Sequence, residues 1–371
     1  MAAGAGTELE SRQSHRPSHG SLILLALGLF LTLKGYHSLD GDQAHRLPLL
    51  LHRLNPGLYA SDPFVRSFDA FNPHRGSLTV LEAGSRLVGL PATLALLFAA
   101  TFAVSVWGVH RLASVIHPGG GGAAGWIAVA LFLTAKAGNI GTNHLFEAML
   151  LDRLMALAAA WAAAAWLVES PSKGWRSTAL ALGLAAWLHP SLGLQLALVF
   201  AGAWFAWAAL GGRTAVSWKT AILATTAMGA AILPGLAFNL APFGNLREGL
   251  EPETFRLLTV ELQSPQHMLP HLWRRPQWLA AGAYLVLAAL GMLAMRKDDR
   301  VASDAGESAT TAARWRVGTL LGVVLVWLVG SWAAVEVVQH VGATVFQPFR
   351  IATFGRGLCL VLASGRVQEL W

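Results

Sequence analysis

Long apolar runs recur along the whole chain, and this feature restricts most strongly how the chain can fold. Of the 371 residues, 54% are hydrophobic and only 13% are charged, and the mean hydropathy is +0.50. The apolar residues form continuous runs rather than the one-sided stripes of helices in soluble proteins. Because a helix needs about 20 apolar residues to cross a bilayer, the sequence predicts an all-α, polytopic membrane protein.

The runs predict about ten transmembrane helices in a domain that extends over residues 21–364. The expected ranges are 21–39, 86–109, 123–138, 149–168, 177–189, 191–210, 220–239, 277–295, 315–338 and 350–364. Two points stay open. The short runs on either side of "HPSLG" (189–193) form either two spans or one broken hairpin, and the last run is either a span or an interfacial helix.

Basic residues indicate the orientation of the chain. The connections "SPSKGWRS" and "GGRTAVSWK" are basic, whereas "GNIGTNHLF" contains no Lys or Arg. Because short cytoplasmic loops are enriched in Lys and Arg, the tails (1–20 and 365–371) are expected in the cytoplasm and the protein in the plasma (inner) membrane. A polar segment, 296–316, is predicted to be a disordered cytoplasmic linker. The net charge of +7 then reflects topology and attraction to anionic membrane lipid, and no nucleic-acid partner is expected.

The first outer loop, residues 40–85, breaks the apolar pattern; we call it the cap. Its stretch "HSLDGDQAHRLPLLLHRLNPGLYASDPF" (37–64) contains three Asp, three His and two Arg. Four leucines at positions 47, 50, 51 and 54 follow helical spacing and predict an amphipathic helix at the membrane interface, with Pro48 in its first turn. Asp62 before Pro63 predicts the N-cap and first residue of a second helix. The cap is therefore expected to hold Asp40 and Asp42 at the outer end of the helical bundle.

An acidic residue directly after the first span, followed by surface helices, resembles the GT-C superfamily of multi-pass membrane glycosyltransferases. Three further patches resemble uncharacterised bacterial membrane proteins of that superfamily: "AAWLHPSLGL" (185–194), "SPQHMLPHLW" (264–273) and "FQPFR" (346–350). The chain departs from the superfamily in its acidic pair, which appears as "DQ" or as "DGD" (40–42). It also ends soon after "FQPFR", so a truncated or degenerate member is an alternative.

The resemblance implies transfer of a sugar from a polyprenyl-phosphate carrier to an acceptor on the outer face of the membrane. Such a transfer needs a base for the acceptor hydroxyl and a cation or metal for the departing phosphate. Asp42 is the expected base, and Asp40 and Asp62 are further candidates; a solvated or helix-capping aspartate is the alternative for each. The residues expected to contact the phosphate or the acceptor are His267, Arg350, Gln347, His271 and Glu147. The sequence contains no compact metal-ligand motif, so it identifies no cofactor. A divalent cation that assists the departing phosphate stays an alternative.

Charged residues at the ends of the predicted spans need partners. Asp152 and Arg153 point apart as sequence neighbours, and the expected partners are Glu336, Arg350 and Arg356. His189 before Pro190 is expected to satisfy backbone carbonyls at a helical break.

Two other classes of function remain as alternatives. One is a transporter, which would carry its charges at the middle of the bilayer. The other is a non-catalytic membrane protein of a cell-envelope assembly. Convergence of Asp42, His267 and Arg350 at a cavity open to lipid would favour the transferase.

Overall fold

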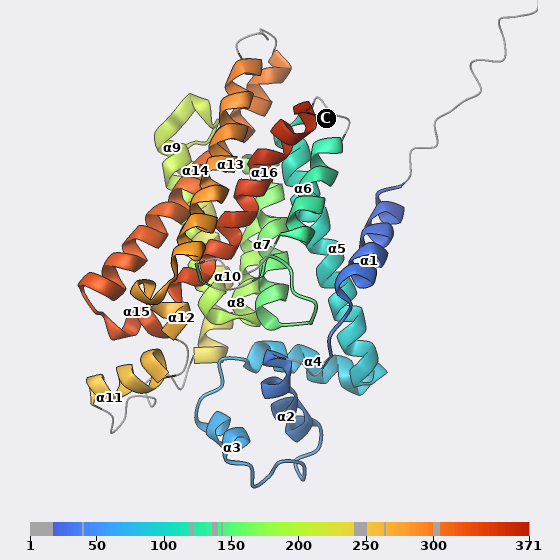
Figure 1. The fold of residues 1–371 in the computed structure, drawn as a ribbon, viewed down its shortest axis with the longest axis vertical. Helices are drawn as coiled ribbons and strands as arrows, with labels where there is room; N and C mark the ends of the chain where they lie inside the picture. Colours follow the sequence, from blue (N-terminus) through green and yellow to red (C-terminus); the bar gives the residue numbers. More distant parts are fainter. Residues whose placement is uncertain are drawn as a thin grey trace, which may run out of the picture.

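The protein is a bundle of long helices with short helices around one end (Figure 1). The computed structural model describes residues 18–38, 41–118, 122–135, 140–141, 144–240, 251–262, 265–299 and 305–370. Every regular element in these ranges is helical, and none of the described residues forms a strand. The prediction of an all-α fold is confirmed.

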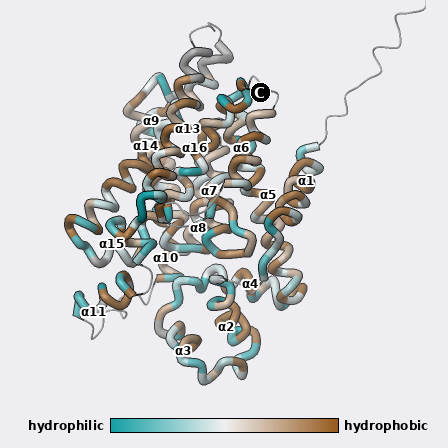
Figure 2. Tube along the Cα trace, in the orientation of Figure 1, coloured by the Kyte–Doolittle hydropathy of each residue, from teal (hydrophilic) through white to brown (hydrophobic). Residues whose placement is uncertain are grey.

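In the described part of the chain, ten long or apolar helices follow one another in the order of the predicted spans. They are α1 (His19–Lys34), α5 (Leu90–Ile116), α6 (Ala123–Thr134), α7 (Asp152–Glu169), α8 (Pro171–Leu188), α9 (Pro190–Leu210), α10 (Trp218–Leu240), α13 (Arg275–Asp299), α14 (Ala305–Trp332) and α16 (Ala352–Leu370). Among the described residues, five segments are long and apolar enough to cross a membrane: Leu90–Ile116, Pro190–Arg213, Trp218–Leu240, Arg275–Leu293 and Ala309–Val337. Figure 2 shows the apolar residues concentrated along helices such as α1 and α14. The chain is a membrane protein with several apolar helices, and a total of ten spans stays a prediction.

The short helices belong mainly to the cap and to the segments before α13 and α16. The cap contains α2 (Asp42–Leu54), α3 (Pro63–Ala70) and α4 (Arg75–Val88). The other short elements are η2 (Gly211–Arg213), α11 (Pro252–Arg256), the π-helix η4 (Leu257–Leu262), α12 (Pro265–Met268), η5 (Pro270–Leu272), η6 (Ala333–Val337), α15 (Val341–Val345) and η7 (Pro348–Ile351). Figure 1 shows α2, α3 and α4 at one end of the bundle, opposite the C-terminus.

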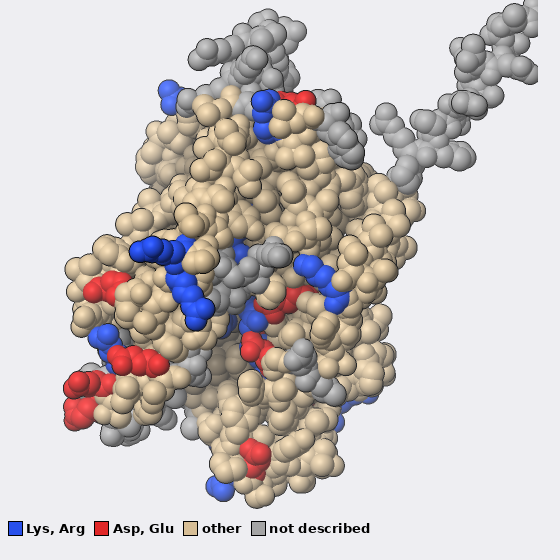
Figure 3. Space-filling model, viewed as in Figure 1, with Lys and Arg blue, Asp and Glu red and all other residues tan. Residues whose placement is uncertain are grey.

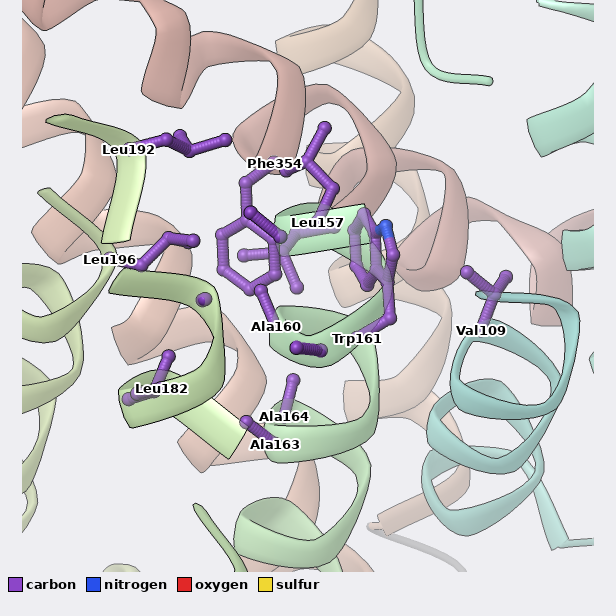
Figure 4. Packing of buried hydrophobic residues seen from close by; sticks show 14 of the residues in the cluster. Val109, Leu157, Ala160, Trp161, Ala163, Ala164, Leu182, Leu192, Leu196 and Phe354 are labelled. Atoms are coloured by element: carbon purple, nitrogen blue, oxygen red, sulfur yellow. The ribbon is translucent and has the colours of Figure 1, made fainter. Parts of the chain in front are cut away.

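Helix α7 lies at the centre of the bundle, because its run of alanines lets other helices approach closely. Its Trp161 packs edge-on against Phe132 of α6 and lies 4.7 Å, between ring centroids, from Phe354 of α16 (Figure 4). A Cβ atom at Gly108 would lie 2.7 Å from the backbone of Trp161, and one at Gly357 would collide with its ring. Glycines on α5 and α16 thus make room for Trp161, one of the largest buried side chains of the core.

The structure bears on both points that the sequence left open. Helices α8 and α9 are two full helices with only His189 between them, and a Cβ atom at Gly193 would collide with the backbone of Ala186. They form a tightly packed helical hairpin; α9 belongs to a segment long and apolar enough to cross a membrane, and a second span at α8 stays a prediction. Residues 352–365 of α16 are all buried. The interfacial alternative for this helix is therefore wrong, since α6, α13 and α14 surround it.

The predicted disorder of residues 296–316 is wrong for 296–299 and 305–316, which are helical. Two arginines of this segment bind backbone carbonyls at the ends of other helices. Arg314 donates from Nε to the carbonyl oxygen of Ile116 at 2.9 Å. Arg316, which is 5% exposed, donates to the carbonyls of Thr214 and Val168. Because the last carbonyls of a helix lack partners and carry partial negative charge, these cations stabilise the C-terminal ends of α5 and α7.

The cap contains the two predicted helices, but the first one differs in its start and its orientation. Helix α2 begins at Asp42, so that Pro48 lies inside the helix and not in its first turn. Leu47 and Leu50 are 6% and 0% exposed and belong to the protein core. The predicted membrane-facing orientation of these leucines is wrong, because α4 covers them. Asp62 caps α3, as predicted, by accepting from two backbone N–H groups at 2.8 and 3.1 Å.

Candidate functional site

Charged side chains from the cap and from the bundle meet at the N-terminal end of α7. Figure 3 shows acidic and basic side chains gathered beside a hollow in the middle of one face of the molecule. Three carboxylates and three guanidinium groups lie around the N-terminal end of α7, some of them buried beneath the surface, and we call them the charge cluster: Asp42, Glu147, Asp152, Arg46, Arg153 and Arg350. Since the cap and the bundle each contribute to the cluster, it exists only in the folded protein.

Arg153 connects the cap to the segment before α7. Its guanidinium donates to both carboxylate oxygens of Glu147, at 2.9 and 2.8 Å, and its Nη1 donates to Oδ2 of Asp42. The side chain of Glu147 is 7% exposed, whereas that of Asp42 is 44% exposed. Burial alone would raise the pKa of the Asp42 carboxyl, but the charge and hydrogen bond of Arg153 outweigh it and leave the pKa lowered. Asp42 is therefore an ionised carboxylate that is open to solvent on one side.

Asp152 anchors the cap to the bundle. It is the first residue of α7, its side chain is 1% exposed, and it forms an ion pair with Arg46 of α2. Its Oδ2 accepts a hydrogen bond from Nδ1 of His74 at 2.7 Å. Burial and the charge of Arg46 lower the pKa of His74 more than the carboxylate raises it, so His74 is neutral and donates from Nδ1. The negative charge also lies at the N-terminus of a helix, where the helix dipole favours it.

Arg350 of η7 contacts an imidazole rather than a carboxylate. Its Nη1 lies 2.9 Å from Nε2 of His189, and its Nε is buried with no hydrogen-bond partner among the described residues. His189 also caps α9, because its Nδ1 accepts from the backbone N–H of Leu192 at 3.2 Å. The expectation that His189 satisfies carbonyls is therefore wrong. It accepts an N–H instead, since Pro190 begins a new helix there.

The segment "FQPFR" is held in place by α9. Gln195 donates from Nε2 to the carbonyl oxygen of Phe346 at 2.7 Å, and the hydroxyl of Ser191 donates to the same carbonyl. Gln347 has a φ of +47°, in the left-handed region that side chains rarely adopt. Its Oε1 is buried without a hydrogen-bond partner in the described part of the chain. The backbone of Gln347 is therefore strained, and this strained residue forms the turn that leads into η7, the helix that contains Arg350.

His267 joins the cluster electrostatically. Its Nδ1 lies 3.4 Å from the carbonyl oxygen of Gly141. Burial lowers the pKa of His267, the charge of Arg350 lowers it further, and the charge of Asp42 acts in the opposite direction. The charges of Asp42 and Arg350, which are distant from His267 in the sequence, thus act on the His267 imidazole.

Other predicted residues lie outside this cluster. His271 binds Glu336 with its Nδ1 at 3.0 Å and its backbone N–H at 2.9 Å, and its side chain is 54% exposed. Asp62 caps α3, and Asp40 lies outside the described residues. Among the described residues, no group of three His, Cys, Asp or Glu side chains is placed to hold a metal ion.

The partners of Asp152 and Arg153 are separate, as expected, but they are not the residues that we expected. Glu336 binds His271, and Arg356 lies over the ring of Tyr284, 5.9 Å from its centroid. Asp152 binds Arg46 and His74 of the cap, whereas Arg153 binds Asp42 of the cap and Glu147 of the segment before α7. Arg46 follows Asp42 by four residues, so the two lie on one face of α2. This spacing in the sequence could have indicated that both residues face the same site. Nothing in the sequence pointed to His74.

Comparison of the chain with protein-family models, with curated proteins and with solved structures found no match.

Proposed function

We propose that the protein is a membrane glycosyltransferase that moves a sugar from a polyprenyl-phosphate carrier to an acceptor at the membrane surface beside the cap. One observation carries the proposal: a half-exposed carboxylate, Asp42, and a buried cation without a carboxylate partner among the described residues, Arg350, belong to one cluster. Transfer of a sugar from a lipid phosphate needs a base beside the acceptor hydroxyl and a cation beside the departing phosphate.

Arg350 is the cation best suited to bind the carrier phosphate. Arg46 and Arg153 each form ion pairs with carboxylates. Arg350 instead faces His189, both of whose ring nitrogens are placed as acceptors. A neutral imidazole has only one acceptor nitrogen, so this contact leaves one partner unsatisfied. A phosphate would accept from the planar fork of Arg350 and from an Nε2–H of His189, which would satisfy both groups.

Asp42 is the base in this proposal. Arg153 occupies Oδ2 and fixes the carboxylate, while the exposed side of the group can accept a hydrogen bond from an acceptor hydroxyl. In the reaction the acceptor oxygen bonds to the anomeric carbon of the sugar as the bond from that carbon to the phosphate oxygen breaks. Asp42 takes the hydroxyl proton, and the phosphate leaves with the bonding electron pair, stabilised by Arg350.

The position of the charges favours surface chemistry over transport. Asp152 is the first residue of α7, His189 directly precedes α9, and Arg350 lies two residues before α16. A transporter is expected to place such groups near the middle of its helices. The cluster lies at helix ends instead, where a lipid phosphate group resides.

The proposal is tested by transfer in reconstituted vesicles that contain sugar-loaded polyprenyl phosphates and a panel of acceptors. Asp42→Asn keeps the shape and removes the basicity, so turnover should fall about 100-fold or more while carrier binding is retained. Asp69→Asn, an exposed change in the same cap, should leave turnover unchanged. Full turnover by Asp42→Asn would refute the assignment of the base, and a wild-type protein that neither binds nor transfers any carrier would refute the function.

A further inference from the structure

An apolar groove of about 470 Å³ lies between α9 and α14. Both helices belong to segments that are long and apolar enough to cross a membrane. The groove is lined mainly by Leu194, Leu198, Val199, Val323, Val326 and Trp327. Leu198 is 47% exposed and Val326 is 72% exposed, so the groove opens on the side of the bundle. When α9 and α14 cross a membrane, this opening would face the hydrocarbon chains of the lipid.

The inner end of the groove reaches the segment that carries Arg350. Phe346 and Pro348 line this end, together with Gln195, which binds the Phe346 carbonyl. Pro348 and Arg350 belong to the same 3₁₀-helix, and two residues of such a helix span about 4 Å. Gln195 is 1% exposed, and its Oε1 has no hydrogen-bond partner among the described residues. The groove thus has an apolar opening and a polar inner end close to a cation.

We infer that this groove binds the isoprenoid chain of the carrier whose phosphate lies at Arg350; the inference rests on the proposed function. The groove has the volume of a small-molecule site, about 300–1,000 Å³. Its apolar wall suits a hydrocarbon chain that enters from the bilayer, and Arg350, two residues beyond Pro348 of the lining, suits one anionic headgroup. A single groove next to a single guanidinium fits a one-chain phosphate lipid better than a two-chain phospholipid.

Two glycines of α14 offer a matched pair of variants. Gly330 lines the groove, and a Cβ atom at this position would have no heavy atom within 4 Å. Gly322 lies on the same helix with equally open surroundings, but it does not line the groove. Gly330→Phe therefore fills the groove, and Gly322→Phe adds the same side chain elsewhere on α14. Leu198→Trp fills the groove from the opposite wall.

The test uses the full-length protein in nanodiscs and a synthetic polyprenyl phosphate with a diazirine in the chain near the phosphate. After irradiation, peptide mapping should find the label on the groove residues of α9 and α14. Gly330→Phe and Leu198→Trp should each weaken binding of the probe about tenfold, which corresponds to about 1.4 kcal/mol. Gly322→Phe should bind as the wild type does, and unlabelled polyprenyl phosphate should compete, whereas phosphatidic acid should not.

The outcomes separate this inference from the proposed function. If the probe binds in a manner that depends on Arg350 but labels other helices, and the groove variants bind normally, the groove assignment is wrong and the proposed function stands. If phosphatidic acid competes equally well, the groove is a general lipid site and the assignment to the isoprenoid chain is wrong. If the wild-type protein does not bind the probe, both proposals are overturned.

Discussion

Arg350 and His189 are in direct contact, with Nη1 of the guanidinium 2.9 Å from Nε2 of the imidazole. The contact joins the segment before α16 to the turn between α8 and α9, which are 161 residues apart in the sequence. Because the other imidazole nitrogen already accepts the N–H of Leu192, His189 cannot serve as a full acceptor for Arg350. An anion that binds Arg350 would relieve this mismatch.

Replacing Arg350 should therefore weaken carrier binding. Hydrogen bonds to charged groups contribute about 1.5–3 kcal/mol, so Arg350→Ala should raise the Kd for polyprenyl phosphate roughly 10- to 100-fold. Arg350→Lys should be intermediate, because it keeps the charge and loses the planar fork. Binding is measured by native mass spectrometry or by scintillation proximity, with Arg66→Ala in the cap as an exposed control. Equal affinity of Arg350→Ala and wild type would exclude Arg350 as the phosphate contact.

Asp152→Asn should destabilise the docked cap. The substitution leaves Arg46, whose side chain is 15% exposed, without its carboxylate. Breaking a buried ion pair from one side costs about 3–5 kcal/mol. The measurement is thermal unfolding in detergent, combined with the rate at which a protease cleaves the cap. Asp69→Asn should change neither quantity, and a wild-type unfolding temperature for Asp152→Asn would show that the cap is held by other contacts.

Leu50→Asp should also release the cap, and the reason is core packing. Leu50 is 0% exposed, whereas Leu58, four residues beyond the end of α2, is 44% exposed. A core Leu→Ala change costs about 2–5 kcal/mol, and a buried carboxylate adds a desolvation penalty. Leu50→Asp should increase protease cleavage of the cap, whereas Leu58→Asp should leave it nearly unchanged. The same cleavage rate for both variants would contradict the packing of α2 against the bundle.

The stability of the cap should decrease in mild acid. The pKa of His74 is lower in the folded protein than its ordinary value of about 6.5, so the unfolded state binds more protons below that pH. The contribution of His74 to the free energy of unfolding is therefore complete above about pH 6.5. It is lost progressively as the pH falls towards the lower pKa that His74 has in the folded protein. The pKa of Asp42 is also lowered, and its contribution is lost in the same direction, but only below about pH 4.

His74→Gln should remove the first of these two pH effects. Glutamine keeps an N–H donor for Asp152 but does not titrate. The unfolding temperature of this variant should depend less on pH than that of the wild type just below pH 6.5, while the fall below about pH 4 remains. Parallel curves for variant and wild type across the upper range would show that another group causes the pH dependence.

The orientation of the chain is open to a direct test. Basic short loops predict that the end of the bundle opposite the cap is cytoplasmic. A reporter inserted at Gly212, in η2, should behave as cytoplasmic, and one inserted at the exposed turn around Gly57 should behave as exterior. The reverse result for both reporters would place the charge cluster on the cytoplasmic side and would remove the argument for an outer-face acceptor.

The sequence alone determined the features that depend on neighbouring residues. Apolar runs predicted the order and positions of the long helices, because a helical backbone satisfies its own polar groups in an apolar setting. Asp62 and Pro63 predicted the start of α3, because a cap and a fixed φ act within one turn. The charged stretch after α1 predicted that the cap contributes to a polar site, and Asp42 and Arg350 were named from the resemblance that the sequence carries.

The tertiary structure alone decided the partners. Asp42 and Arg153 are 111 residues apart, and no local pattern determines which carboxylate a guanidinium meets. Helix packing likewise decides four other features: the buried face of α2, the role of His74, the interior position of α16 and the groove between α9 and α14. Hydrophobicity specifies that a face is buried but not against what, because the hydrophobic effect is non-directional; shape and charge complementarity between distant segments settle the rest.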